Sequence, residues 1–193
     1  MPNMDMPLEK LRTYRGRNPR PADFDEYWDA ALAEMHALGT GCELTPARFQ
    51  VPGAVRCYDM YFTGVGGARI HAKYLLPERR DGRVPAVLRF HGYSGSSGTD
   101  WLEHLGYAGA GMAVLALDCR GQAGESEDSS RVSGNTQSGH IIRGLLDAPE
   151  RLYYRAQFLD TAQLARIAMA QPEIDPARVG AQGHSQGGAL TLA

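Results

Sequence analysis

The segment Arg178-Val179-Gly180-Ala181-Gln182 runs directly into Gly183-His184-Ser185-Gln186-Gly187, and this stretch decides the fold. Its first half predicts a short strand, and residues 188–193 can open a helix. A strand that turns sharply into a helix holds the residue at the turn in a strained conformation with its side chain exposed. Glycines on either side leave room for such a turn. The pattern therefore predicts a nucleophile elbow with Ser185 as the nucleophile.

The Gly-x-Ser-x-Gly pentapeptide is a weak signal by itself, because glycine and serine are common residues. The alternative is a glycine-rich turn between a strand and a helix, in which the serine has no catalytic role. The strand before the motif and the helix after it favour the elbow, since this is the context in which the motif carries a nucleophile.

Apolar runs and helical periodicity upstream of the elbow predict strands and helices in alternation. Strands are expected at residues 55–63, 68–76, 84–90, 112–117 and 178–182, and helices at residues 24–38, 101–108 and 155–171. The first two strands flank a glycine-rich hairpin turn, and Asp23 is expected to cap the first helix. This order indicates an α/β protein with a mainly parallel sheet behind antiparallel N-terminal strands. With the elbow it predicts the α/β-hydrolase fold, as a single domain over residues 1–193.

Residues 121–149 do not fit this alternation. The segment is rich in Gly, Ser and Asp and has little periodicity. Loops of this length in compact domains are functional lids or contact segments, or else they are disordered. We favour a lid or a subunit contact, with disorder as the alternative.

Composition and charge exclude several classes of protein. The chain has 193 residues, of which 43% are hydrophobic, and a formal net charge of −2, which is an ordinary globular profile. A charge so close to zero does not attract nucleic acid or an anionic membrane. The three cysteines lie far apart, the N-terminus lacks the apolar core of a signal peptide, and no apolar run could span a bilayer. We therefore expect a soluble, cytoplasmic protein with no nucleic-acid or membrane partner.

The tripeptide His91-Gly92-Tyr93 follows directly after the expected strand 84–90. In this fold the oxyanion hole uses two backbone N–H groups, one from the residue after the nucleophile and one from a loop after an earlier strand. These would be Gln186 and Tyr93. His91 is not expected to be the general base, because the fold places its catalytic histidine after the serine. It is expected to be a structural hydrogen-bonding residue.

The remaining polar candidates suggest no further chemistry. Asp118, before Arg120-Gly121-Gln122, is expected to brace a loop. The histidines show no spacing typical of metal ligands, so no metal site is expected. The sequence has no GxGxxG motif and no P-loop, so no cofactor is expected either.

Taken together, these motifs resemble the acetyl xylan esterase / cephalosporin-C deacetylase family of carbohydrate esterases. The resemblance extends over nearly the whole chain, and the pairing of RGQ with GxSQGG is more specific than GxSxG alone. It is carried by the segments Asn18-Pro19-Arg20-Pro21-Ala22-Asp23-Phe24-Asp25-Glu26-Tyr27-Trp28, His91-Gly92-Tyr93, Arg120-Gly121-Gln122 and Gly183-His184-Ser185-Gln186-Gly187-Gly188. The chain departs from the family pattern at Ala123 and Ala189, where glycine is expected.

The resemblance implies a metal-free, cytoplasmic esterase that removes acetyl groups from acetylated xylo-oligosaccharides and related small esters. It also implies a homo-oligomer, often a hexamer. Ser185 matches the family nucleophile, and the backbone amides of Tyr93 and Gln186 match its oxyanion hole. The alternatives are a peptidase or another carboxylesterase on the same fold, or a non-catalytic hydrolase-like domain.

The fold orders its catalytic triad as Ser, then Asp or Glu, then His. Residues 186–193 follow the serine and contain neither an acid nor a histidine. The triad Asp and His are therefore expected outside this chain, as parts of a longer enzyme. The 193 residues alone are expected to be inactive.

Overall fold

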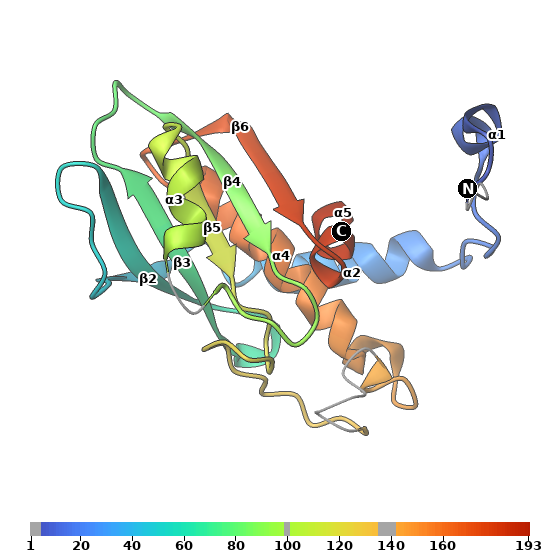
Figure 1. Cartoon of the computed structure of the whole chain (residues 1–193). Helices are drawn as coiled ribbons and strands as arrows, with labels where there is room; N and C mark the ends of the chain where they lie inside the picture. The colour runs from blue at the N-terminus through green and yellow to red at the C-terminus, as the bar shows by residue number, and fades with distance from the viewer. Residues whose placement is uncertain (1–4, 99–100, 135–141) are drawn as a thin grey trace.

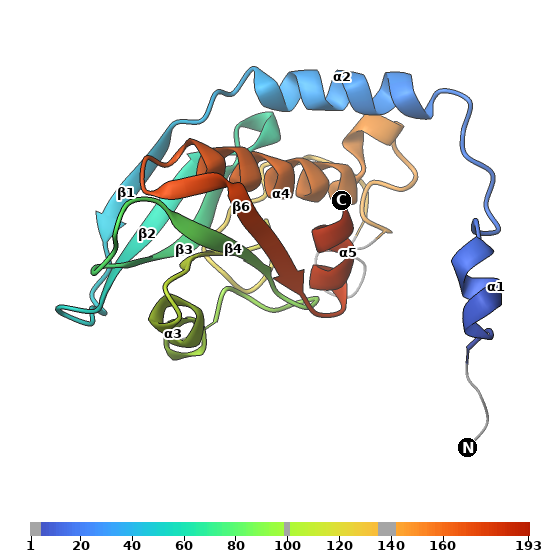
Figure 2. The same cartoon turned by 90° about the horizontal axis from the view of Figure 1, so that it is seen from above.

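The computed structural model describes residues 5–98, 101–134 and 142–193, which form a twisted six-stranded sheet with helices on both faces (Figures 1 and 2). The strands are β1 (Cys42–Pro46), β2 (Val55–Thr63), β3 (Arg69–Pro77), β4 (Val84–Phe90), β5 (Ala113–Leu117) and β6 (Ile174–Gly183). The helices are α1 (Leu8–Thr13), α2 (Phe24–His36), α3 (Leu102–Gly109), α4 (Tyr153–Ala170) and α5 (Gln186–Leu192), with short 3₁₀ turns η1 (Val65–Gly67) and η3 (Pro149–Arg151). The predicted α/β class is confirmed.

The sheet has the strand order β1-β2-β3-β5-β4-β6. The β1, β2 and β3 strands pair antiparallel, and β3 joins β5 antiparallel as well. The β4 strand pairs parallel with both β5 and β6. The antiparallel N-terminal strands and the predicted hairpin are present, and within the described residues the parallel part consists of β5, β4 and β6.

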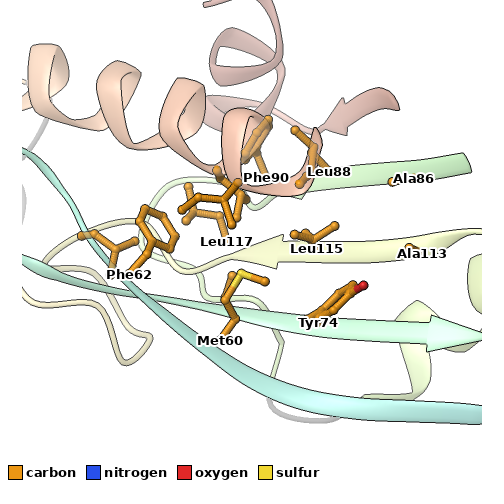
Figure 3. Close-up of a cluster of buried hydrophobic side chains, with 14 of the residues drawn as sticks. Met60, Phe62, Tyr74, Ala86, Leu88, Phe90, Ala113, Leu115 and Leu117 are labelled. Carbon is orange, nitrogen blue, oxygen red and sulfur yellow. The ribbon is translucent and has the colours of Figure 1, made fainter. Parts of the chain in front are cut away.

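The centre of the sheet is buried on both faces. In β5, Leu115 and Leu117 pack into a cluster with Leu164 and Ile167 of α4, whereas Val114 packs into a second cluster on the α3 side. Figure 3 shows Leu115 and Leu117 among the first cluster, between the sheet and the helix that covers it. A strand covered on both faces reads as a continuous apolar run, which is why this strand could be predicted from its composition.

The predicted cap of α2 is wrong. Asp23 makes no side-chain bond to the helix, and its backbone angles (φ −93°, ψ 12°) differ from the extended backbone that a capping residue adopts. Instead, the Phe24 N–H donates to the carbonyl of Pro21 in a turn that leads into the helix. The helix packs through Ala31 and Met35 against Val65 and other residues, and lies outside α4 (Figure 2).

Three features lie outside the expected pattern or outside the described residues. The edge strand β1 and the helix α1 were not predicted, and α1 stands apart from the sheet without a buried residue (Figures 1 and 2). Residues 135–141 of the long loop are outside the described residues, so its role as a lid or contact stays a prediction. In the described parts of the chain, no helix is both long and apolar enough to cross a membrane.

Candidate active site

The strand–turn–helix geometry predicted around Ser185 is present. The β6 strand ends at Gly183, α5 begins at Gln186, and Ser185 between them is exposed and has φ 56° and ψ −118°. Left-handed φ values are uncommon for residues other than glycine and concentrate at functional sites. Among the described residues only Ser94 and Ser185 are non-glycine residues with positive φ, and both lie at this candidate site.

Two glycines make the turn sterically possible. A Cβ atom on Gly183 would lie 2.1 Å from the carbonyl oxygen of Gly187. A Cβ atom on Gly187 would lie 2.0 Å from the carbonyl oxygen of Phe90, at the end of β4. Both clashes are with backbone atoms, so no side-chain rotation relieves them. The elbow is therefore packed directly against the end of β4.

Substitution of Gly183 by alanine should disturb the elbow. Because the clash is with backbone, we expect Gly183→Ala to lower the free energy of unfolding by about 2–3 kcal/mol, at the upper end of overpacking costs. Gly180→Ala is the matched control, since a Cβ atom on this glycine of the same strand meets nothing within 4 Å. Denaturant unfolding of both variants is the measurement. Equal stability of the two variants would contradict this account of the elbow.

The loop that carries the expected oxyanion residue lies beside the serine. A Cβ atom on Gly92 would be 3.9 Å from the Cβ atom of Ser185, so the backbone before Tyr93 runs alongside the elbow. Gln186 is the first residue of α5, where backbone N–H groups have no partner within the helix. The structure thus brings the segments of both expected donors next to Ser185, and their role as donors stays a prediction.

His91 is a structural residue, as its position in the sequence predicted. Its Nε2 lies 3.0 Å from the backbone N–H of Cys119 and must accept that hydrogen bond. The proton is therefore on Nδ1, which donates to the carbonyl of Gly92 at 2.7 Å. Burial lowers the pKa of His91 and favours this neutral form. Both ring nitrogens hold the loop, so neither is left for proton transfer.

Gln122 links the two sides of the site, a role that the sequence alone did not reveal. Its side-chain oxygen accepts from the backbone N–H of Ser94 at 2.8 Å, and its Nε2 donates to the side chain of Gln186 at 2.9 Å. The Tyr154 hydroxyl donates to the same oxygen of Gln186 at 2.9 Å. The Gln122 side chain therefore connects Ser94, which follows the expected donor Tyr93, to Gln186, the other expected donor.

Arg120, two residues before Gln122, forms a buried ion pair that supports this loop. Its guanidinium binds both carboxylate oxygens of Asp160 in α4, at 2.6 and 2.7 Å, and both side chains are 2% exposed. It also donates to the carbonyl of Val65, and its own carbonyl accepts from the Tyr153 hydroxyl at 2.6 Å. The ion pair joins the Arg120 loop to α4. Loss of either partner would be costly, because it would leave a buried charge without compensation.

Asp118 braces two loops, as predicted. Its carboxylate accepts hydrogen bonds from the backbone N–H groups of Ser97 at 2.5 Å and Glu125 at 2.9 Å. It also binds Nδ1 of His71 at 2.7 Å. A cavity of about 230 Å³ lies next to the elbow and is lined by Gly92, Ser97 and His184 among others.

The described residues contain no partner for the Ser185 hydroxyl. Across residues 5–98, 101–134 and 142–193, no side chain hydrogen-bonds to it, and His140 lies outside these ranges. No group of three or more His, Cys, Asp and Glu side chains in the same ranges could hold a metal ion. The described residues therefore supply the serine and the backbone segments of the two expected oxyanion donors.

Comparison with known proteins agrees with this geometry. The sequence profile of the acetyl xylan esterase (AXE1) family matches residues 1–193. The chain belongs to the acetyl xylan esterase family. Acetyl xylan esterase 1 from Thermoanaerobacterium sp. JW/SL YS485 is 57% identical, with a TM-score of 0.90 over 98% of this chain and 59% of that one. The acetyl xylan esterase from Paenibacillus sp. R4 is 32% identical, with a TM-score of 0.86 over 97% of this chain and 59% of that one.

Two more distant matches to this acetyl xylan esterase family member are an acetyl esterase, matched by sequence, and a structure that shares its fold. The acetyl esterase Axe7A from Xylanibacter ruminicola is 25% identical over 190 residues, which cover 95% of this chain and 42% of that protein. A dienelactone hydrolase-like phosphotriesterase, P91, from metagenomic libraries is 24% identical, with a TM-score of 0.51 over 72% of this chain and 53% of that one. The chain thus spans 42% to 59% of the length of the family relatives it matches.

Proposed function

We propose that the protein is a serine esterase that removes acetyl groups from acetylated xylo-oligosaccharides and related small esters, with Ser185 as the nucleophile. The observation that carries the proposal is the strained, exposed Ser185 in an elbow packed against the loop of Gly92 and Tyr93. Membership of the acetyl xylan esterase family, and the names of its relatives from Thermoanaerobacterium and Paenibacillus, support the acetyl ester as the substrate.

The proposed reaction proceeds through an acyl-enzyme. Ser185 Oγ attacks the acetyl carbonyl carbon while a general base takes the hydroxyl proton. The backbone N–H groups of Tyr93 and Gln186 stabilise the oxyanion of the tetrahedral intermediate. The intermediate collapses, the sugar hydroxyl leaves with the proton from the base, and acetyl-Ser185 remains. Water then attacks this ester with the help of the same base, and acetate is released.

The general base is proposed to be a histidine beyond residue 193. The fold places its acid and histidine after the nucleophile, and the family relatives are longer than this chain. Without a base, the serine hydroxyl stays protonated near neutral pH and is a weak nucleophile. Residues 1–193 alone should therefore be inactive, and the complete gene product active.

The substrate proposal is tested by comparing esters of different acyl chain and alcohol. We expect the complete gene product to release acetate from acetylated xylo-oligosaccharides and from the 3′-acetate of cephalosporin C. Butanoate and longer esters should react much more slowly, and the chain of residues 1–193 should release no acetate. Preference for long acyl chains or for peptide bonds would instead indicate another carboxylesterase or a peptidase on this fold. No hydrolysis by the complete product would indicate a non-catalytic domain.

Two properties of the whole protein accompany this proposal. We propose a homo-oligomer, up to a hexamer, and a cytoplasmic location, both implied by the family resemblance. Light scattering of the complete gene product and its fractionation from cells test them directly.

A further inference from the structure

His71 is a buried histidine with a carboxylate on each side. It lies in β3, its side chain is 1% exposed, and neither of its nitrogens faces water. Its Nδ1 lies 2.7 Å from Asp118 Oδ2, and its Nε2 lies 3.2 Å from Asp59 Oδ1 on β2. The proposed reaction uses neither the imidazole nor Asp59.

The two contacts specify the protonation state of the ring. A neutral imidazole has one N–H group, and its other nitrogen carries a lone pair. At His71 that lone pair would face a carboxylate oxygen, whichever nitrogen carried the proton. Only the imidazolium donates a hydrogen bond to both Asp59 and Asp118. The geometry therefore favours a charged histidine, and the 2.7 Å contact with Asp118 has the length of a charge-assisted hydrogen bond.

The Asp118 carboxylate links His71 to the two loops beside Ser185. It accepts from Ser97 N–H in the loop that contains Tyr93, and from Glu125 N–H in the loop that contains Gln122. The Gly124 backbone packs directly against this carboxylate, since a Cβ atom on Gly124 would lie 2.1 Å from Asp118 Cγ. A change in the Asp118 carboxylate therefore moves both loops that flank Ser185.

Further bonds tie these two loops to each other. The backbone N–H of Ala123 donates to the carbonyl of Gly95 at 3.2 Å, and that of Cys119 donates to His91. The Gln122 side chain reaches Ser94, as described above. The two loops are thus one assembly, and Asp118 is its ionised anchor.

We propose that protonated His71 is a positioning residue for ester hydrolysis, which holds Asp118 so that the Tyr93 and Gln122 loops keep the oxyanion donors aligned with Ser185. The proposal rests on the proposed function of Ser185. His71 acts through Asp118 and takes no part in proton transfer with the substrate.

The surroundings of His71 favour its charged form. Burial alone lowers its pKa, but the hydrogen bonds and charge of Asp118, together with Asp59 and Glu125, outweigh burial and raise the pKa. The ring of Tyr61 on β2 packs at 4.9 Å from the imidazole. Asp59, His71, Asp118 and Glu125 line a common cavity, and the other charged residues that line it are Lys73 on β3 and Arg48.

A raised pKa gives a definite pH dependence. The favourable contribution of the imidazolium is complete below the ordinary histidine pKa of 6.5 and is lost as the pH rises through the raised pKa. Above that pH, the Nε2 lone pair faces the Asp59 carboxylate and the anchor loosens. We therefore expect kcat to decline on the alkaline side, in a step that coincides with the titration of His71.

Variants of the complete gene product separate charge from shape. In His71→Asn, the side-chain amide places a neutral donor near the position of Nδ1, whereas His71→Leu offers no donor to Asp118. We expect His71→Leu to lower kcat for p-nitrophenyl acetate by roughly 10- to 100-fold, with little change in KM, because alignment is lost rather than substrate binding. His71→Asn should keep most of the activity and lack the alkaline step. His36→Asn, at an exposed position, is the matched control and should behave as the original protein.

Histidine NMR and hydrogen exchange complete the test without relying on turnover. We expect the His71 imidazole to titrate above 6.5, and the Ser97 amide to lose protection from exchange in His71→Leu. A His71 pKa at or below 6.5, an alkaline step that persists in His71→Asn, or unchanged kcat in a folded His71→Leu would each overturn the proposal. Hydrolysis that survives Ser185→Ala would overturn the proposed function instead, while the NMR titration would remain interpretable.

Discussion

Replacement of Ser185 by alanine in the complete gene product should lower kcat for p-nitrophenyl acetate by roughly 10³-fold or more, because it removes the hydroxyl that is proposed to form the acyl-enzyme. The substitution removes one oxygen atom from an exposed residue, so the fold should be retained. Initial rates and a thermal melt of the same preparation are the measurements. A normal melt with a large loss of activity assigns the effect to chemistry.

Ser129→Ala is the matched control for this prediction. Ser129 is also exposed, and its hydroxyl donates to the Gly66 carbonyl in a loop away from the elbow. Its activity should stay within about twofold of the original, as for most surface substitutions. If Ser185→Ala retained comparable activity, the serine would not be the nucleophile.

The second large effect is expected at Tyr93, where the backbone rather than the side chain is proposed to act. Tyr93→Pro removes the N–H group, and loss of one oxyanion donor costs about 3 kcal/mol of transition-state stabilisation, or a 10²- to 10³-fold fall in kcat. Tyr93→Phe keeps the N–H group and should have a mild effect. The kinetics of both variants on p-nitrophenyl acetate are compared, with thermal melts to exclude unfolding.

The outcome at Tyr93 distinguishes two roles. A large loss of kcat in Tyr93→Pro together with a small loss in Tyr93→Phe would support the backbone N–H as the donor. The contacts of Phe90 and the Gly92 backbone already place this loop at the elbow. Equal damage from both changes would indicate that the phenol is the working group.

Features that depend on neighbouring residues could be predicted from the sequence. The elbow could be recognised because its two glycines, its serine and its flanking strand and helix are consecutive. The strands β4 and β5 could be recognised as apolar runs because both faces of the sheet are covered there. By contrast, β1 is an edge strand whose residues are mostly exposed, so it has no apolar pattern to detect.

Features that depend on distant residues could not be predicted. Arg120 and Asp160 are 40 positions apart, and His71 and Asp118 are 47 positions apart. Their partnership arises only when β3, β5 and α4 come together, and no local spacing indicates it. The predicted cap at Asp23 was wrong for a related reason. The residue type suggested a cap, but the turn before the helix gives Asp23 a different backbone conformation.

The proposed function depends on a covalent intermediate at Ser185. The most direct measurement treats the complete gene product with a fluorophosphonate and maps the adduct by mass spectrometry. We predict a single adduct on the peptide that contains Ser185, formed in proportion to the loss of acetate release and absent from Ser185→Ala. An adduct on another serine, or full labelling of Ser185 with acetate release unchanged, would contradict the account.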